Sequence, residues 1–275
     1  MKKISAVIIT KNEEKLLENC LESLYWVDEI IVVDSESTDN TVNISKKYTD
    51  KVYVQKWLGF SEQKNFANKK VSKSSKYILS IDADERCTPE LIKEITTIIN
   101  KNPKYDIYEI PRKNILLGKE LKYGGWYQDF QKRLFRNNSK YRWKGDIHET
   151  IDAQQIGKLK NGFIHLTHRS IDTMLSKTIQ YSQYEAEKRL KQKYRKVNLF
   201  VIFKEMALEF GYRCIYKRGY KDGMEGWIEI IYQTFSKFIT YARLWQLQQN
   251  PSIEDKYRAT DKFNIKRLNE KNINN

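Results

Sequence analysis

The sequence predicts an α/β fold, with a Rossmann-like and mostly parallel sheet flanked by helices over residues 1–170 and a helical extension over residues 171–275. Three observations support this prediction. Short apolar runs alternate with helical patterns through the first half of the chain, which is typical of parallel βα units. Several of these runs end in polar or acidic side chains. From residue 171 onward, apolar residues recur at helical spacing.

The expected strands are short and rich in β-branched and aromatic residues, as buried strands are. Helices are expected to open at Asn12, near Ser61 and at Thr88, and a strand, a helix and a strand joined by short connections form a right-handed parallel unit. A Gly and aromatic loop at residues 123–127 suits a sugar ring, or it only packs a hairpin. The expected strands are residues 4–10, 28–34, 52–57, 77–81, 105–110, 131–135 and 162–168.

The composition narrows the class of protein. Of 275 residues, 40% are hydrophobic and 13% are aromatic, which provides a sizeable core and argues against disorder. Fifty Lys and Arg against 35 Asp and Glu give a net charge of +15, which favours a polyanionic partner: nucleic acid, an anionic membrane surface or a phosphorylated substrate. No stretch matches a nucleic-acid-binding module, so we expect no nucleic-acid partner.

The cysteines and the apolar runs indicate the compartment. Cys20, Cys87 and Cys214 are an odd, scattered set, which suggests a reducing compartment and no disulfide framework. The first apolar run is too short for a signal peptide, and no stretch approaches the roughly 18 uninterrupted apolar residues of a membrane span. We therefore expect a cytoplasmic protein, and attachment to the inner face of the membrane is left open.

The fourth expected strand, residues 77–81, ends in a cluster of acids that includes Asp82 and Asp84. Ligands bind at the carboxyl ends of strands in open α/β sheets, so both aspartates should face a crevice. Acids two residues apart, separated by the small Ala83, can hold one hard cation that also touches phosphate oxygens; Mg²⁺ or Mn²⁺ on a diphosphate suits them. The alternative is a polar loop that caps the next helix.

Polar side chains also follow the first two expected strands: Thr10, Asn12 and Glu13 after one, Asp34 and Ser35 after the other. Parallel strand order brings these ends together, and acceptors there suit a base amide and ribose hydroxyls. For Asp34, capping of the following helix is the alternative. Neither G-x-G-x-x-G nor the Walker pattern occurs in this half, so the dinucleotide and P-loop families are disfavoured, and a metal at the acidic strand end would carry the phosphate charge.

Four blocks in this order resemble glycosyltransferase family 2, whose fold is GT-A: residues 8–14 (IITKNEE), 31–41 (IVVDSESTDNT), 63–65 (QKN) and 82–85 (DADE). The subgroup that they most resemble is the bacterial lipopolysaccharide-core type, the glucosyltransferases that act on inner-core heptose. This resemblance implies a nucleotide-sugar donor, above all a UDP-hexose, a Mn²⁺ or Mg²⁺ cofactor, inversion at the anomeric carbon, and a glycan or lipid-linked acceptor.

The resemblance also implies roles by position. Lys64 would approach the nucleotide, Asp82 would reach the ribose or the metal, and Asp84 would bind the metal. His165 would be an extra metal ligand, with His168 as its alternate. Without the resemblance, Lys64 belongs to the exposed first turn of a helix, and a His in an apolar strand is a hydrogen-bonded core residue. Three residues are implied to contact the uridine: Thr10, Glu13 and Asp34.

Direct inverting transfer needs a base that takes the proton of the acceptor hydroxyl while that hydroxyl attacks the donor. Residues 141–150 supply our candidate, Glu149, with Asp146 and His148 as competitors. His-Glu stands here where the family usually carries an acidic pair such as Glu-Asp, so the assignment stays open among the three. The alternative is that Glu149 and Asp146 only pair with surface cations such as Arg142.

The C-terminal region is basic and aromatic. Residues 177–275 hold 20 Lys and Arg against 11 Asp and Glu, a net charge of +9. Helices of this kind can lie on an anionic bilayer, or they can seal the sheet or a subunit interface. Residues after Pro251 are polar and rich in Asn and Lys, and we expect them to fray. The side chains expected as membrane anchors are Trp227, Tyr232, Phe235, Phe238, Tyr241 and Trp245.

The sequence as a whole predicts an inverting, metal-dependent glycosyltransferase. A sugar-phosphate nucleotidyltransferase is one alternative, but such enzymes usually carry a Gly-rich loop after the first strand, where this chain has Thr10-Lys11-Asn12-Glu13. A nonenzymatic basic protein that binds RNA or membrane is another, and its binding would be indifferent to substitution of Asp84. The donor sugar, the acceptor, the linkage and the oligomeric state are not encoded in any motif.

Overall fold

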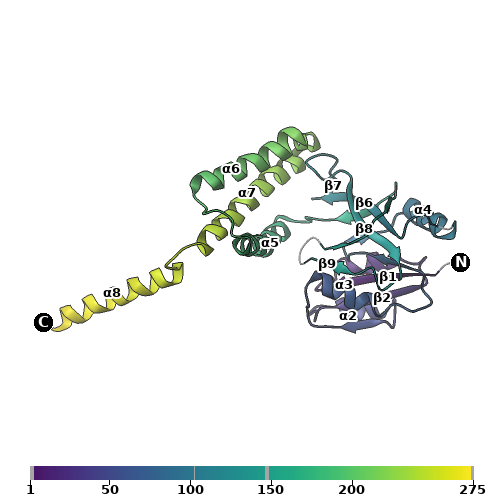
Figure 1. Ribbon diagram of the computed structural model, residues 1–275, viewed down its shortest axis with the longest axis horizontal. Helices are drawn as coiled ribbons and strands as arrows, with labels where there is room; N and C mark the ends of the chain where they lie inside the picture. The colour runs from purple at the N-terminus through teal and green to yellow at the C-terminus, as the bar shows by residue number, and fades with distance from the viewer. Residues whose placement is uncertain (1–2, 102, 146–148, 274–275) are drawn as a thin grey trace. The chain divides into compact units, whose positions relative to one another are not determined.

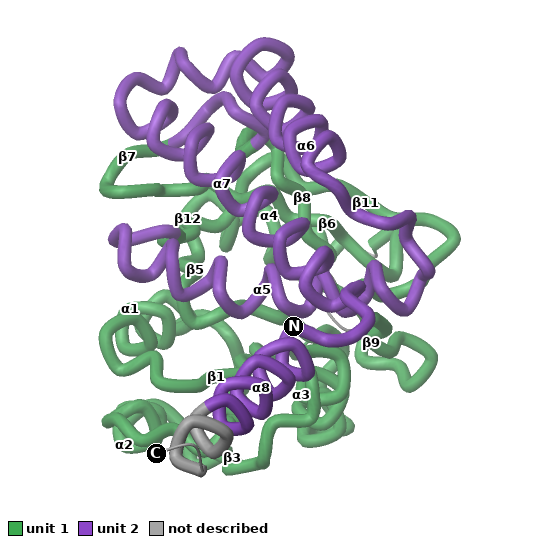
Figure 2. Tube along the Cα trace, turned by 90° about the vertical axis from the view of Figure 1, so that its left-hand side faces the viewer, with its two compact units in different colours: residues 1–120, 126–167 green, residues 121–125, 168–275 purple. Residues whose placement is uncertain are grey.

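The structure, a computed structural model, describes residues 3–101, 103–145 and 149–273 (Figure 1). The chain divides into two compact units, shown in two colours in Figure 2. The first unit comprises residues 1–120 and 126–167, and the second comprises residues 121–125 and 168–275. A short segment between two strands therefore belongs to the second unit, although it lies within the sequence of the first.

Parallel strands joined by short helices open the first unit, as predicted. The sheet order β3-β2-β1-β4 places the first strand in the middle, and every pair among these four strands is parallel. The elements are β1 (Ile4–Thr10), α1 (Leu17–Glu22), β2 (Glu29–Asp34), α2 (Thr41–Lys46), β3 (Val52–Val54), α3 (Phe60–Asn68) and β4 (Tyr77–Ser80). The carboxyl ends of β1, β2 and β4 therefore lie along one edge of the sheet.

The sheet continues beyond β4 with antiparallel and parallel pairs, and ten strands of the described residues belong to it. Strand β8 pairs antiparallel with both β4 and β6, and β12 runs parallel to β6 and antiparallel to β5. This mixed α/β sheet, followed by C-terminal helices, confirms the predicted fold class. The remaining elements of the first unit are β5 (Glu85–Arg86), α4 (Pro89–Asn100), β6 (Ile107–Leu116), β7 (Lys119–Glu120), β8 (Asp129–Arg136), β9 (Trp143–Lys144), β10 (Thr150–Ile151), β11 (Ile156–Lys158) and β12 (Phe163–Leu166), of which β9 and β10 form a separate two-stranded sheet.

Side-chain alternation along the central strand divides the apolar core between the two faces of the sheet. Ile4, Ala6 and Ile8 of β1 are buried in one cluster with residues of α1 and α4, whereas Val7 belongs to a second cluster with Ala67 of α3. Successive side chains of a strand point to opposite faces, so both faces of β1 are buried under helices. This explains why its sequence is mostly apolar, with polar side chains only at Ser5 and Thr10.

Two local expectations were wrong in their limits. The first helix begins at Leu17 and not at Asn12. Asn12 has a φ of 55° and belongs to a loop: its backbone N–H donates to Ser37 Oγ at 2.7 Å, and its side-chain oxygen accepts from the Thr38 backbone N–H at 2.8 Å. The third strand ends at Val54 and not at residue 57.

Helices form most of the second unit. The helix α5 starts with a capping box in which Ser170 and Thr173 bond each other's backbone N–H groups. Buried Tyr241 and Leu244 pack with Val201 to form a small core. Within the described residues, no helix is both long and apolar enough to cross a membrane. The elements are α5 (Ile171–Lys191), α6 (Leu199–Gly211), the π-helical turn η1 (Tyr212–Tyr216), the 3₁₀ turn η2 (Gly219–Asp222), α7 (Gly223–Leu247) and α8 (Ile253–Ile273).

The segment after Pro251 is helical, and the expectation that it frays was wrong. Ser252 accepts a hydrogen bond from the backbone N–H of Asp255, and Glu254 pairs with Arg258 one turn later at 3.3 Å. An N-terminal cap, acids in the first turn and i,i+4 pairs all favour helix formation in a polar sequence.

Two of the six expected membrane anchors make contacts within the second unit. Tyr241 is 2% exposed, and Tyr232 donates its hydroxyl to the Met174 carbonyl at 2.7 Å. For these two side chains the expectation of an exposed anchor was wrong, because they hold α7 against the rest of the second unit. The other four aromatic side chains of that set are each 38–43% exposed.

The turn η2 clamps residues 121–125 within the second unit. Asp222 is 5% exposed and accepts hydrogen bonds from the backbone N–H groups of Lys122 at 3.1 Å and Tyr123 at 2.8 Å. A Cβ on Gly226 would lie 2.1 Å from the Gly219 carbonyl oxygen, so the close packing of this turn requires glycine there. The Gly-Tyr-x-Asp-Gly-x-x-Gly run at residues 219–226 is thus a structural clamp on the 121–125 segment.

Candidate functional site

The acidic end of β4 is the centre of the candidate site, and Asp82 is its first side chain. Both carboxylate oxygens of Asp82 accept hydrogen bonds from the Arg133 guanidinium, and Lys64 Nζ lies 3.5 Å from Oδ1. Burial alone would raise the pKa of Asp82, but the positive charges of Arg133 and Lys64 outweigh it and hold that pKa well below its ordinary value. Asp82 is therefore ionised at neutral pH.

Arg133 links Asp82 to a second acid. It projects from β8, which pairs with β4, and it is 3% exposed. Its guanidinium also donates to Glu85 Oε1 at 2.8 Å, while the other oxygen of the fully buried Glu85 accepts from the Asp82 backbone N–H at 3.0 Å. The two carboxylates raise the pKa of Arg133 further above its ordinary value, against the opposing effect of burial.

Sequence reasoning missed both Arg133 and Glu85 as site residues. A signal was present in each case. Arg133 is a cation in the middle of a predicted strand, and Glu85 is the last acid of the run that follows β4. Cations and acids are almost never fully buried without a partner, so a strand that buries an arginine has to supply one or more acids nearby.

Lys64 joins the acidic end of β4 to the predicted base. It comes from α3, is 3% exposed, and donates to Glu149 Oε1 at 2.5 Å while it lies near Asp82. The Trp143 ring, whose centroid lies 4.7 Å from Lys64 Nζ, covers the ammonium group. The structure thus brings together three predicted site residues whose positions in the sequence lie far apart: Lys64, Asp82 and Glu149.

Asp84 faces a different partner. Its Oδ2 lies 3.3 Å from Nε2 of His165, which stands on β12. The other ring nitrogen of His165, Nδ1, lies 2.5 Å from Asn114 Oδ1. The Asn114 amide nitrogen donates a hydrogen bond to the Trp126 carbonyl at 3.0 Å. The amide oxygen of Asn114 is therefore the atom that accepts from His165.

This network sets the tautomer of His165. With the proton on Nδ1 donated to Asn114, neutral His165 directs the lone pair of Nε2 at the Asp84 carboxylate. In this tautomer two acceptor atoms face each other 3.3 Å apart, an arrangement that suits a shared cation. The carboxylate oxygen of Asp84 and the imidazole nitrogen of His165, whose ring is oriented by the Asn114 amide, form a donor set that suits Mn²⁺.

Among the residues that the structure describes, this arrangement offers two side chains to a metal ion, Asp84 and His165. The described residues contain no group of three or more His, Cys, Asp and Glu side chains arranged to hold a metal ion. Asp82, predicted as a second ligand, has both oxygens bonded to Arg133. Asp84 and His165 fit a cation whose remaining positions are filled by water and by the phosphate oxygens of a ligand, as is usual for Mg²⁺ sites.

At the ends of β1 and β2, Thr10 and Asp34 contact each other. Asp34 is fully buried, and its carboxylate accepts from Thr10 Oγ1 at 3.0 Å and from both the backbone N–H and the hydroxyl of Ser37. These contacts hold the loop between β2 and α2 and do not cap the helix, because α2 begins at Thr41 with Asn40 as its N-cap residue. Glu13 lies in the neighbouring loop, where its backbone N–H donates to Thr41 Oγ1 at 2.8 Å. A role for these residues toward uridine stays a prediction.

The other predicted site residues lie either outside the described residues or in the second unit. Asp146 and His148, the competitors of Glu149, lie outside the described residues. His168, the alternate to His165, belongs to the second unit and is bonded there to Glu229, with Nδ1 3.2 Å from Oε2. The structure thus gives the two histidines different surroundings.

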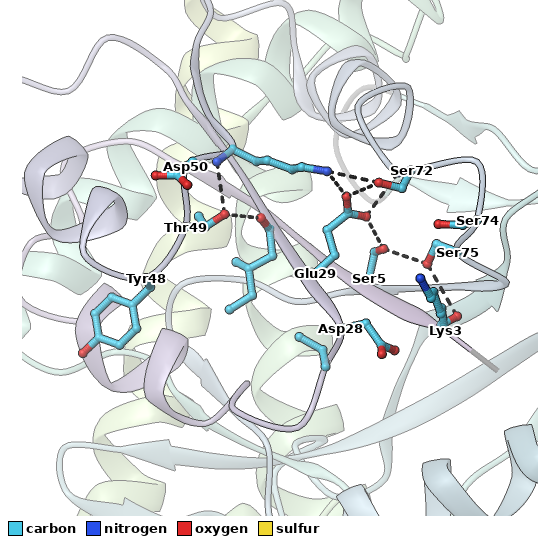
Figure 3. Close-up of a pocket in the computed structure, with 13 residues that line it drawn as sticks. Lys3, Ser5, Asp28, Glu29, Tyr48, Thr49, Asp50, Ser72, Ser74 and Ser75 are labelled. Carbon is cyan, nitrogen blue, oxygen red and sulfur yellow. Dashed lines mark hydrogen bonds and ion pairs between the residues drawn. The ribbon is translucent and has the colours of Figure 1, made fainter. Parts of the chain in front are cut away.

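A polar pocket of about 430 Å³ lies at the opposite edge of the sheet (Figure 3). Its lining includes Ser5 and Glu29, at the amino ends of β1 and β2, with Lys51 and Ser72. Glu29 accepts hydrogen bonds from Ser5, Lys51 and Ser72. Burial raises the pKa of Glu29, but these hydrogen bonds outweigh it and lower that pKa from 4.5 to about 2. Because its polar groups bond one another, we assign this pocket to stability.

Comparison with known proteins yields matches over most of the chain. The family model described as glycosyl transferase family 2 matches residues 5–160. An uncharacterised glycosyltransferase of Rickettsia typhi is 33% identical over 262 residues, which cover 90% of this chain and 88% of the relative. The lipopolysaccharide core biosynthesis glycosyltransferase LpsC of Rhizobium meliloti is 27% identical, with 92% and 96% covered. The crystal structure of S. aureus TarS residues 1–349 aligns with a TM-score of 0.45 and 16% identity, over 94% of this chain and 92% of that one.

Proposed function

The chain belongs to glycosyltransferase family 2, and from this premise we propose that it transfers a hexose from a UDP-sugar, with inversion, to a glycan or lipid-linked acceptor. The observation that carries the proposal is the position of Lys64, which contacts Asp82 at the end of β4 and Glu149, the predicted base. Nucleotide-sugar transfer needs a site for the diphosphate and a base for the acceptor within reach of one another. The contacts of Lys64 with both acids support the proposal that the two lie together here.

Glu149 is the proposed base. Its carboxylate is 17% exposed, so an acceptor hydroxyl can reach it, and Lys64 holds one of its oxygens in place. It would take the hydroxyl proton during attack on the anomeric carbon. Lys64 itself is covered by Trp143 and is held between two acids, which suits a group that orients side chains at the edge of the donor site.

Asp84 and His165 are the proposed metal ligands, with Mn²⁺ or Mg²⁺ as the cofactor. When bound, the cation would neutralise the charge that develops on the leaving diphosphate. Asn114 keeps the His165 lone pair directed at the site, and Arg133 keeps Asp82 ionised beside it. Thr10, Glu13 and Asp34 remain the proposed contacts of the uridine.

The acceptor proposal rests on similarity. LpsC is named as a lipopolysaccharide core biosynthesis enzyme, and its alignment covers 92% of this chain. We propose an acceptor of the same class, a sugar of a lipid-linked envelope glycan, with catalysis on the inner face of the membrane.

The test is a panel of nucleotide sugars with Mn²⁺, in which slow donor hydrolysis without acceptor is scored. We expect hydrolysis of one UDP-hexose, with water in place of the acceptor hydroxyl. Glu149→Gln should reduce this hydrolysis at least about 100-fold while donor binding by calorimetry changes little. Asp84→Asn should instead weaken donor binding in Mn²⁺. Asp152→Asn, an exposed acid paired with Lys144, is the matched control and should behave as the wild type.

Two results would contradict the proposal. Tight binding of a nucleoside triphosphate without binding of any nucleotide sugar would favour a nucleotidyltransferase. Loss of donor binding in Glu149→Gln, equal to that in Asp84→Asn, would show that Glu149 serves the donor and is not the base.

A further inference from the structure

The helix α6 exposes its apolar side chains. Leu199, Phe200 and Phe203 are 68%, 72% and 59% exposed, and Val201 is the residue of this helix that is buried. A surface helix of a globular protein normally turns such residues inward and presents polar ones to water. Consecutive large apolar side chains left in water mark a surface that binds something.

The acidic side chains of α6 point the other way. Glu209 pairs with Arg213 at 2.6 Å and with Lys237 of α7 at 3.6 Å. Glu205 accepts a hydrogen bond from the Tyr194 hydroxyl at 3.4 Å. The negative charges of α6 are therefore used within the second unit, and its outward side retains apolar groups.

Basic residues stand at both ends of this helix. Lys193, Arg195 and Lys196 precede it, and all three are exposed. After it come the exposed Arg218 and Lys221. The apolar helix thus lies between two positive clusters.

Aromatic side chains accompany the second basic cluster. In η1, Ile215 and Tyr216 are both 73% exposed. Lys217 Nζ lies 5.6 Å from the ring centroid of Tyr212 and 5.2 Å from that of Tyr216. Aromatic rings with adjacent lysines are enriched at the level of lipid headgroups.

We propose that α6 and η1 form an interfacial surface that binds an anionic lipid bilayer. The 13 residues of α6 extend over about 20 Å, which is too short to span a bilayer but suits a helix lying in its plane. Its apolar side chains enter the boundary between headgroups and acyl chains, and the basic clusters at its two ends meet anionic headgroups.

A second copy of the chain fits this surface poorly. Because both ends of α6 are basic, pairing two copies of the helix in either direction places like charges opposite each other. An anionic bilayer complements both clusters at once. The inference rests on the surface of the second unit alone and not on the proposed transferase activity.

The test is co-sedimentation of the full chain with lipid vesicles in the absence of donor and metal. We expect binding to phosphatidylcholine vesicles that contain phosphatidylglycerol, with much weaker binding to phosphatidylcholine alone. The double variant Phe200→Ser/Phe203→Ser should reduce binding at least tenfold. Phe263→Ser on α8, which alters a phenylalanine of similar exposure (64%), is the matched control and should bind as the wild type.

A label on α6 identifies the occupant directly. In Phe203→Cys, the introduced thiol is exposed, whereas the three native cysteines are buried. An environment-sensitive dye on it should shift to the blue when anionic vesicles are added. A blue-shifted dye without lipid, together with a dimer in ultracentrifugation that the double variant dissociates, would overturn the proposal in favour of a second copy. Vesicle binding that the double variant leaves unchanged would also overturn it.

Discussion

Arg133→Met tests whether the buried ion pairs at the end of β4 hold the candidate site together. Arg133 is 3% exposed and its guanidinium donates to two acids, Asp82 and Glu85. In the variant, Glu85 remains fully buried and keeps Arg112, which lies 3.5 Å away. The lost hydrogen bond between Arg133 and the charged Glu85 costs about 2–3 kcal/mol. Asp82 keeps Lys64 and is partly exposed, so its loss is about 1 kcal/mol. The expected destabilisation is about 3–4 kcal/mol, within the range for breaking one side of a buried pair.

The pH dependence of this effect follows from the pKa of Asp82. In the wild type that pKa is depressed, so the contribution of Asp82 is present above its unfolded value of about 3.9 and is lost as the pH falls through the folded value. The loss of Arg133 removes the largest charge that lowers the pKa of Asp82, so that pKa is higher in the variant than in the wild type. The difference in stability should therefore be complete at pH 7 and should shrink as the pH falls below the pKa of Asp82 in the folded variant, because protonated Asp82 gains nothing from the guanidinium.

The measurement is urea unfolding followed by circular dichroism at several pH values. Arg136→Met is the control: Arg136 lies on the same strand and pairs with Asp106 at 2.6 Å, but both side chains are more than a third exposed. It should cost less than about 1 kcal/mol. A loss in Arg133→Met no larger than that of the control, or one that does not vary with pH, would refute this account of the site.

Three further predictions concern residues in other parts of the chain. Glu29→Gln should destabilise the protein by about 2–3 kcal/mol at pH 7, because the pKa of Glu29 falls from 4.5 to about 2 on folding. In thermal unfolding, the difference in stability between wild type and variant should disappear as the pH falls from about 4.5 to about 2. Equal stability at pH 7 would contradict this prediction. Gly226→Ala should lower stability by about 1–3 kcal/mol, since its Cβ would meet the Gly219 carbonyl oxygen, and a variant with unchanged urea midpoint would exclude that clash. Asn114→Leu should weaken Mn²⁺ binding in calorimetry about 10- to 100-fold by releasing the tautomer of His165; unchanged affinity would remove His165 from the proposed ligands.

Much of the first unit was predictable from sequence because its strands are buried on both faces. The runs at residues 4–10, 28–34 and 77–81 are mostly apolar, and that pattern is local. The helical character of the C-terminal region was also readable from periodicity. The errors occurred where a local pattern was ambiguous: the polar start of the first helix is a loop held by Ser37 and Thr38, and the polar tail is a capped helix.

The sequence by itself determined the α/β class, the order of its strands along the chain, and the acids at the end of β4. Only the tertiary structure decided which charges meet: that Arg133 holds Asp82 and Glu85, that Lys64 reaches Glu149, and that Asn114 orients His165 toward Asp84. Strand and helix patterns arise from side-chain periodicity over a few neighbouring residues. Contacts between side chains 48 to 85 residues apart depend on sheet order and register, which no local pattern encodes.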